Sequence, residues 1–355
     1  MSSYKINTQN DRIITFDILR IVAAFAVVLL HVSAHNWHNS FPSAEWEIRN
    51  VYDSISRWCV PVFVMISGAL FLNSHKPLKL SRLYRKNVLR IFIAFLFWSF
   101  VYAIYNCMVS EQLGNYKALG ARFISGPFHL WFLKMLIGLY IIIPVLRPVV
   151  IKRRNEIYFL CLSLVTVFIV PTLLKVIGWF SADLAYVLTN GFKKLELNIA
   201  IGYSGYFVLG HYLYNYKINS LTRKTIYCLG FFSFICVVCF THFTSHYIHS
   251  PYSYFYSNLN PFTLLEAAAV YVWVLSSFKQ VSNTAHRYII QLSNCSFGIY
   301  LVHPLVLDII NRFMPSFHFL LLMLYIPLIS FFIFFVSYLV IKAIRQIPFL
   351  KSFVT

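Results

Sequence analysis

The first long apolar segment contains the residue pair whose types and spacing best suit chemistry. Arg20 and His31 are eleven residues apart, and eleven steps of about 100° return a helix to the same face. The same steps rise about 16 Å, so the two side chains would lie at different depths. Asp17 can pair with Arg20 from one turn earlier. The spacing suits an anion held by Arg20 whose reactive end reaches His31, a candidate general base. The simpler alternative is a surface arginine and a histidine that only packs.

A second candidate group is basic and precedes the third apolar segment. Arg82, Arg85 and Lys86 occupy adjacent positions of a predicted helix just below the membrane. Such a cluster can bind phosphate groups through charge-assisted hydrogen bonds. Basic residues at this depth also attract anionic lipid, so the pattern predicts either a phosphate site or a lipid contact.

Ionisable residues also occur in the later apolar segments. Glu266 lies in the eighth of these segments and His303 in the ninth, where such groups are costly and usually functional. We expect Glu266 to face the interior, where it can orient a histidine or pair with Lys134. His129 and Trp131 open the fourth segment, although both residue types are also common in the interfacial belt. Glu266, His303, His129 and Trp131 are therefore further candidates for the site.

Three later histidines suggest a metal, but we do not expect one. His242, His246 and His249 share helical spacing beyond the seventh segment. We place them in an aromatic outside loop without a nearby carboxylate, which does not favour a metal ion. His31 and His35 are four residues apart, but the segment between them lacks the glutamate of a metalloprotease helix.

The composition indicates that a membrane protein positions these residues. Charged residues make up 12% of the 355, hydrophobic residues 59% and aromatic residues 19%. A soluble domain carries about a quarter charged residues, so this chain has too little polar surface to face water. The formal net charge is +19, but no basic stretch belongs to a soluble domain, and we expect no nucleic acid. The seven cysteines fall mostly in apolar segments and are interpreted as packing residues.

About 20 apolar residues cross the hydrocarbon as a helix, which predicts about ten spans. The second is short and carries Pro61 and Gly68, so we expect it to be tilted or broken. The spans are predicted near 13–35, 57–73, 88–109, 129–148, 156–178, 199–216, 224–243, 259–278, 288–310 and 318–341.

The distribution of lysine and arginine predicts the orientation. With the N-terminus inside, every inside loop is rich in basic residues and the outside loops hold far fewer. An even number of spans returns the C-terminus to the same side. The sequence therefore predicts an all-α, polytopic membrane helix bundle with both termini cytoplasmic. We expect a single membrane domain over residues 1–355 with no appended soluble domain.

Five short motifs follow one another in order over most of the chain. They are F-D-I-L-R with R-x10-H (Arg20, His31), S-R-W-C-V-P-V-F-V-M-I-S-G-A-L-F (56–71), R-x-x-R (Arg82, Arg85), H-L-W-F-L (from His129) and S-F-G-I-Y-L-V-H-P (from Ser296). Each motif is weak alone, but the ordered set resembles the bacterial acyltransferase family 3 of integral membrane O-acyltransferases. By size and the lack of a fused domain, the chain is similar to members that transfer acetyl or succinyl groups to cell-surface glycans.

The resemblance implies a reaction and roles. Family members move an acyl group, usually acetyl, from cytoplasmic acyl-CoA to a hydroxyl of an extracytoplasmic glycan or lipid-linked sugar. Arg20 and His31 match the essential pair of the first helix. Arg82 and Arg85 match the basic motif, which would contact the phosphates of CoA. His31 would either deprotonate the acceptor hydroxyl or carry the acyl group itself, and these two mechanisms stay open.

Position alone suggests the acceptor side. The candidates there are His129, Trp131, His38 and Glu45. The expected partners are an acyl-CoA, the sugar acceptor and the lipid of a bacterial cytoplasmic membrane, and the sequence does not predict an oligomeric state.

Two other functions compete with the enzyme. A transporter or exporter of a glycan or an acylated metabolite is the main alternative, because intramembrane charges also suit a permeation path. Against it, the sequence has no inverted repeat. A non-catalytic assembly partner would need Arg20 and His31 only for folding.

Overall fold

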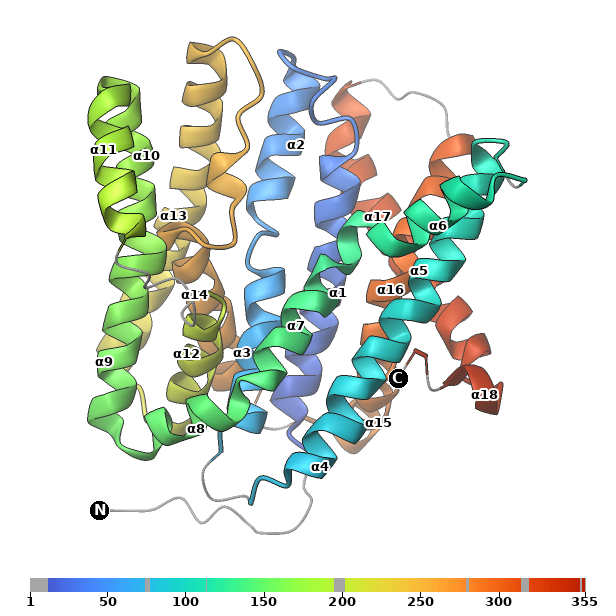
Figure 1. Ribbon diagram of the computed structural model, residues 1–355, viewed down its shortest axis with the longest axis horizontal. Coiled ribbons are helices and arrows are strands. Elements are labelled where there is room, and N and C mark those ends of the chain that lie inside the picture. Colours follow the sequence, from blue (N-terminus) through green and yellow to red (C-terminus); the bar gives the residue numbers. More distant parts are fainter. Residues whose placement is uncertain are drawn as a thin grey trace.

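The protein is a bundle of helices. The computed structural model describes residues 12–73, 77–112, 114–194, 202–278, 281–313, 319–351 and 353–354, and all regular secondary structure within them is helical (Figure 1). Among the described residues, eight helices are long and apolar enough to cross a membrane, or nine if the bent pair α15–α16 forms one span. The predicted polytopic membrane helix bundle is therefore confirmed.

Several spans consist of two or three consecutive helices. The spanning units are α1 (Ile14–Ala34), α2–α3 (Ala44–Ser54, Cys59–Phe71), α4–η1–α5 (Leu80–Arg82, Leu83–Val88, Leu89–Val109), α6–η2–α7 (Tyr116–Ser125, Phe128–Leu130, Trp131–Ile141), α9–η3–α10 (Arg153–Ser163, Leu164–Ile169, Val170–Phe180), α13 (Ser220–Tyr247), η4–α14 (Tyr254–Tyr256, Pro261–Ser277), α15–α16 (Asn283–Ser293, Ser296–Phe313) and α17 (Phe319–Ile344). The shorter helices are α8 (Ile143–Ile151), α11 (Ala182–Lys193), α12 (Ser204–Asn215) and α18 (Pro348–Lys351).

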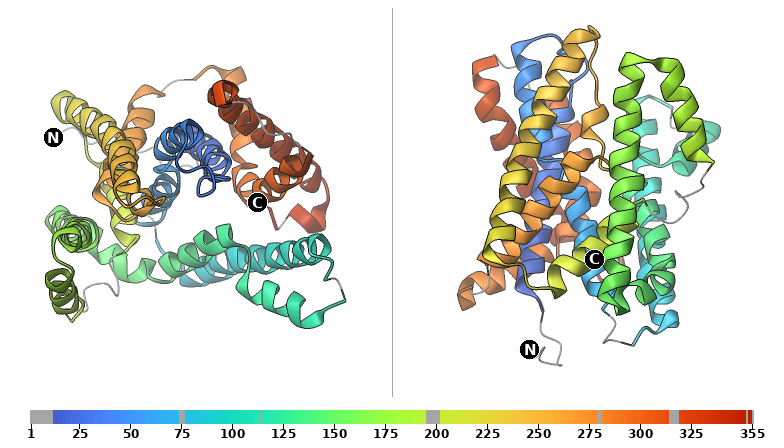
Figure 2. Two further views of the ribbon diagram at one scale, coloured as in Figure 1. Left: turned by 90° about the horizontal axis from the view of Figure 1, so that it is seen from above. Right: turned by 90° about the vertical axis from the view of Figure 1, so that its left-hand side faces the viewer.

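Helix α1 lies near the middle of the bundle. It contacts α2, α3, α14, α15, α16 and α17, and Figure 2 (left) shows it among them when the bundle is seen from above. Its run from Ile21 to Leu30 is apolar on every face, as expected of a helix surrounded by others. The candidate residues of α1 therefore face other helices. The end of the bundle at which α1 begins also carries α4 (Figure 1) and is called the basic end below.

The segment 36–56, expected as an outside loop, contains helix α2. The Ser43 side chain caps this helix by accepting a hydrogen bond from the backbone N–H of Trp46 at 3.2 Å. Together α2 and α3 form one candidate span, Ala44–Phe71, so the predicted span 57–73 was too short at its N-terminal side. A search for apolar runs misses α2 because it is rich in polar residues, four of which (Arg49, Asn50, Asp53 and Ser54) are buried inside the bundle.

The break in this span was predicted, and its position has a local cause. Residues 55–58 form turns between α2 and α3. Pro61 lies just after them, and a proline removes one helical hydrogen bond and disfavours helix at the residue before it. As a result, Asp53 and Arg57 lie at an interruption inside the span rather than in a loop outside it.

Helices α3 and α12 approach each other through two glycines. A Cβ atom at Gly68 would lie 1.8 Å from the carbonyl oxygen of Phe207, and one at Gly210 would lie 2.1 Å from that of Met65. Only glycine allows such close backbone contact, as at many helix interfaces in membranes.

The span predicted at 199–216 is not a complete one in the described residues. Its described part is α12, with 12 residues, which rise about 18 Å against a hydrocarbon thickness of about 30 Å. This short helix accounts for the difference between the ten predicted spans and the nine found in the described residues, and the lower count of eight leaves out the bent pair α15–α16.

Candidate functional site

Three histidines from distant parts of the chain lie together inside the bundle. His31 comes from α1, His129 from η2 and His303 from α16. The ring centroids of His31 and His303 are 5.0 Å apart, and those of His129 and His303 are 6.1 Å apart. His129 and His303 are buried and His31 is half-buried. This histidine cluster includes His129, which sequence position had suggested for the acceptor side.

Tyr102 hydrogen-bonds to backbone groups of α16 next to the histidine cluster. Pro304 lies inside α16 and has no N–H to donate to the helix. The Tyr102 hydroxyl donates to the Leu301 carbonyl at 2.9 Å and accepts from the Leu305 N–H at 3.2 Å. Its ring also contacts that of His129, with centroids 4.9 Å apart. One side chain from α5 therefore satisfies the backbone beside the proline and supports the cluster.

Several buried polar atoms near the cluster lack partners. Neither ring nitrogen of His129, nor Nε2 of His303, has a side-chain hydrogen-bond partner among the described residues. The Nδ1 atom of His303 lies 3.1 Å from the carbonyl oxygen of Ile299, so in a neutral ring Nδ1 donates and Nε2 is left as an acceptor. The buried Nε2 of His303 is therefore able to accept a hydrogen bond from a neighbouring group or a ligand.

Arg57 is a residue of this region that the sequence reasoning missed. It forms an ion pair with Asp53, donates to the Tyr256 carbonyl at 3.2 Å and lies 4.1 Å from the centroid of the Tyr256 ring. It is also close enough to interact electrostatically with His31 and Glu266. In the sequence, Arg57 is the first residue of the predicted span 57–73 and belongs to the S-R-W-C-V-P motif just before Pro61, and these signals could have identified it.

Glu266 faces the interior, as expected, but does not pair with Lys134. Both of its carboxylate oxygens are buried without a hydrogen-bond partner in the described part of the chain. Lys134 instead donates to the Ser125 carbonyl at 3.3 Å and lies over the Phe95 ring. The expected pair fails because Lys134 extends along its own side of the bundle, towards α5 and α6.

At the basic end, the predicted pair of Asp17 and Arg20 is confirmed and enlarged. Asp17 is fully buried and accepts from Arg20 at 2.9 Å, from Arg12 at 2.6 and 2.9 Å, and from Ser293 at 2.6 Å. Arg20 uses only Nη1 for this contact, and its side chain stays 29% exposed. The rest of its guanidinium is therefore able to bind an anion. Tyr140 of α7 lies within electrostatic range.

The basic group of the third span is exposed. Arg82 ends α4, and Arg85 and Lys86 lie on η1, which has the wider winding of a π-helix. All three side chains are exposed, and none forms an ion pair with another described residue. Local π-type winding often accompanies functional sites. The structure therefore leaves these three cations accessible to a phosphate or to lipid headgroups.

A polar cleft opens at the other end of α1. It has a volume of about 420 Å³ and lies among α1, α2, α16 and α17. Polar and charged side chains make up much of its lining, namely those of His35, Asn36, Asn39, Ser40, Glu45, Arg49, Asn311 and Tyr325. Burial, and next the positive charge of Arg49, lower the pKa of His35, so its ring is neutral at pH 7. Such a lining suits a ligand with hydroxyl groups.

Only one predicted acceptor-side residue lines this cleft. Glu45 does so while accepting from Arg49 at 2.7 and 3.0 Å. His38 is exposed and packs against the Trp37 ring. Trp131 begins α7 and packs against Tyr203, with ring centroids 5.8 Å apart. Sequence position alone could not separate these residues, because it does not show which side of the bundle each one faces.

Comparison with known proteins places this arrangement in a family. No curated protein and no solved structure matches the chain significantly. The family model described as an acyltransferase domain, that of acyltransferase family 3, matches residues 13–342. This range contains Arg20, the histidine cluster and the cleft, and it omits only the two ends of the chain. The chain therefore belongs to the acyltransferase 3 family.

Proposed function

We propose that this acyltransferase is an O-acyltransferase that moves a short acyl group from acyl-CoA to a sugar hydroxyl on the other side of the membrane. The observation that carries the proposal is the position of His31 on α1. Arg20 lies on the same helix towards the basic end. Val32, the next residue, and His35, one turn further on, line the polar cleft. A donor approaching from one end and an acceptor from the other would meet at His31.

The donor site lies at the basic end, which we assign to the cytoplasm by the excess of lysine and arginine in its loops. The membrane is then the bacterial cytoplasmic membrane, with both termini inside. The half-buried Arg20 and the exposed Arg82, Arg85 and Lys86 would bind the phosphates of CoA. We favour acetyl over succinyl, because Arg57, the cation beside the histidine cluster, is already paired with Asp53 and would not bind a second carboxylate.

The acceptor site is the polar cleft, which faces the outside in this orientation. Amide and hydroxyl side chains, here Asn36, Asn39, Ser40 and Asn311, hydrogen-bond readily to sugar hydroxyls. The paired carboxylate of Glu45 can accept further bonds. The acceptor is therefore a glycan or lipid-linked sugar whose reactive hydroxyl reaches past Val32 towards His31.

In the proposed reaction His31 acts as a general base. Its imidazole takes the proton of the sugar hydroxyl as the oxygen attacks the thioester carbon. The carbon–sulfur bond then breaks, and the thiolate of CoA receives that proton from the imidazolium. His303 would position the ring through its free Nε2. Direct transfer is preferred to an acyl-histidine because it requires one step fewer.

Ligand binding by purified protein tests this proposal. We expect saturable binding of acetyl-CoA that is weakened at least tenfold in Arg20→Ala and Arg82→Ala but retained in His31→Ala. Succinyl-CoA serves as the comparison ligand for the acyl group. If well-folded protein binds neither CoA, the acyl-CoA donor is wrong and transport becomes the better explanation.

A further inference from the structure

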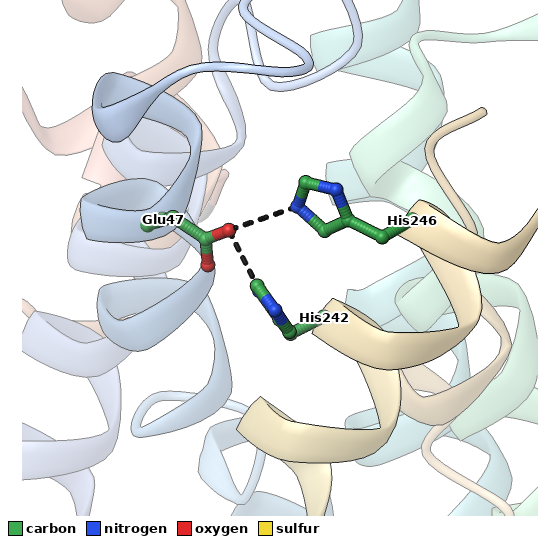
Figure 3. Close-up of side chains that lie close together, drawn as sticks. All are labelled: Glu47, His242 and His246. Atoms are coloured by element: carbon green, nitrogen blue, oxygen red, sulfur yellow. Dashed lines mark hydrogen bonds and ion pairs between the residues drawn. The ribbon is translucent and has the colours of Figure 1, made fainter. Parts of the chain in front are cut away.

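A second group of histidines meets a carboxylate far along the chain from it. His242 and His246 lie one turn apart on α13, and Glu47 lies in the first turn of α2. Figure 3 shows both imidazoles pointing at the Glu47 carboxylate from the facing helix. Its Oε1 atom is 2.7 Å from Nδ1 of His242 and 3.2 Å from Nε2 of His246. The expectation that these histidines have no carboxylate nearby was wrong, because Glu47 is 195 and 199 residues away in sequence.

The three side chains have the composition of a transition-metal site. Two imidazoles at positions i and i+4 of a helix, with a carboxylate from another element, form a common ligand set for Zn²⁺. Mg²⁺ and Ca²⁺ prefer oxygen ligands and do not suit two imidazoles. His249 is exposed and lies beyond the end of α13, so it is not part of the group.

The distances also fit one ion. Zinc binds nitrogen at about 2.0–2.1 Å and carboxylate oxygen at about 2.0–2.2 Å, so tetrahedral ligand atoms lie roughly 3.4 Å apart. The three ligand atoms here all lie within 4.8 Å of one another. Small side-chain rotations are enough to bring them around a common centre. Because all three side chains are about 40% exposed, water could occupy the fourth position.

The surroundings are rigid enough to hold such a site. The His246 ring packs against those of Phe41 and Trp46, with centroids 5.2 and 5.9 Å away. Trp46 is fully buried. One helical turn beyond Glu47, the Asn50 side chain donates to the Val238 carbonyl of α13 at 3.2 Å. The two helices are therefore already packed together before any ion binds.

We propose that Glu47, His242 and His246 bind one divalent transition-metal ion, with Zn²⁺ as the best match, and that this ion fastens α2 to α13. Each histidine coordinates through the nitrogen that faces Glu47 and carries its hydrogen on the other nitrogen. The ligands lie on α2 and α13, whereas the histidine cluster lies on α1, η2 and α16. The site is therefore structural, and it does not depend on the proposed acyl transfer.

Metal binding to the intact, tag-free protein in detergent tests the proposal. After treatment with a chelator, titration with Zn²⁺ should show one saturable site per chain with micromolar or tighter affinity. Co²⁺ should give visible absorption bands of a four-coordinate ion. Glu47→Gln and His246→Ala should each weaken Zn²⁺ binding at least tenfold, and Zn²⁺ should raise the melting temperature of the wild type but not of these variants.

A matched control is provided by His249→Ala, which removes a nearby exposed histidine and should bind Zn²⁺ as the wild type does. The proposal is overturned if the wild type shows no saturable binding, or if the double variant His242→Ala/His246→Ala still binds with unchanged affinity. Either result would mean that Glu47 and the two histidines form only a hydrogen-bonded group.

Discussion

The two ends of helix α1 use buried polar groups in opposite ways. Near its start, Asp17 receives hydrogen bonds from Arg12, Arg20 and Ser293, so both carboxylate oxygens are satisfied within the protein. Near its end, His31 lies against His303, whose Nε2 is buried without a side-chain partner among the described residues. The Asp17 carboxylate therefore has its hydrogen bonds within the protein, whereas the His31–His303 contact leaves one buried acceptor without a side-chain partner among the described residues.

This difference separates Asp17, which stabilises the bundle, from His31, which we propose acts on a substrate. Removing one member of a satisfied, buried ion pair leaves an uncompensated charge and lowers stability. Removing a polar group that makes no hydrogen bond costs less stability, because no hydrogen bond is lost. Stability and activity should therefore respond in opposite ways at the two ends of α1.

The largest effect is expected for His31→Ala. If His31 is the general base, acyl transfer should fall by about 100-fold to 10,000-fold, while the melting temperature stays close to that of the wild type. Radioactive acetyl transfer and thermal unfolding in detergent measure the two quantities. His249→Ala, on the exposed segment after α13, should change neither. A melting temperature that collapses in His31→Ala would assign the residue to packing instead.

Asp17→Asn should, in contrast, lower the stability of the protein. The substitution keeps the size of the side chain but removes the charge that Arg12 and Arg20 share. Breaking a buried ion pair costs several kcal/mol, and because both arginines are partly exposed we expect a loss of about 1–3 kcal/mol in the free energy of unfolding. Asp183→Asn, in the exposed first turn of α11, is the control and should be nearly neutral. Equal melting temperatures for the two variants would contradict the structural role of Asp17.

The contrast along α1 was only partly predictable from the sequence. The spacing of Arg20 and His31, and the pairing of Asp17, depend on local helix geometry, so one segment was sufficient to predict them. The long apolar runs predicted most spans for the same reason. In contrast, the contact of His31 with His303 joins residues 272 positions apart, and no pattern in a single sequence reports such a contact.

Helix α2 shows why the contacts of Arg57 and Glu47 were not predicted from the sequence. Its polar residues Arg49, Asn50, Asp53 and Ser54 are buried inside the bundle, so its hydropathy resembles that of a loop. With 36–56 predicted as a loop, Arg57 appeared at the edge of a span and Glu47 appeared to be remote from His242. Hydropathy reports exposure to lipid, and it cannot distinguish a polar helix packed inside a bundle from a polar loop in water.

A smaller effect on activity is expected in the cleft, the proposed acceptor site. The Nδ2 atom of Asn311 is buried without a partner among the described residues and Asn311 lines the cleft. Asn311→Ala should raise the KM for the sugar acceptor about tenfold, the value of one hydrogen bond of about 1.4 kcal/mol. The kcat value and the affinity for acetyl-CoA should stay unchanged. A change in CoA affinity instead would place the acceptor elsewhere.

The smallest effect on stability should come from Glu266→Gln, and its direction is informative. A buried carboxylate without hydrogen bonds is costly, whereas a neutral amide of the same shape costs less. We therefore expect the free energy of unfolding to stay within about 1 kcal/mol of the wild type or to increase, in contrast to Asp17→Asn. Thermal unfolding of both variants under one condition measures this difference. A marked loss of stability in Glu266→Gln would mean that the Glu266 carboxylate stabilises the fold as Asp17 does. A missing hydrogen-bond partner would then not identify a residue that is dispensable for stability on α14.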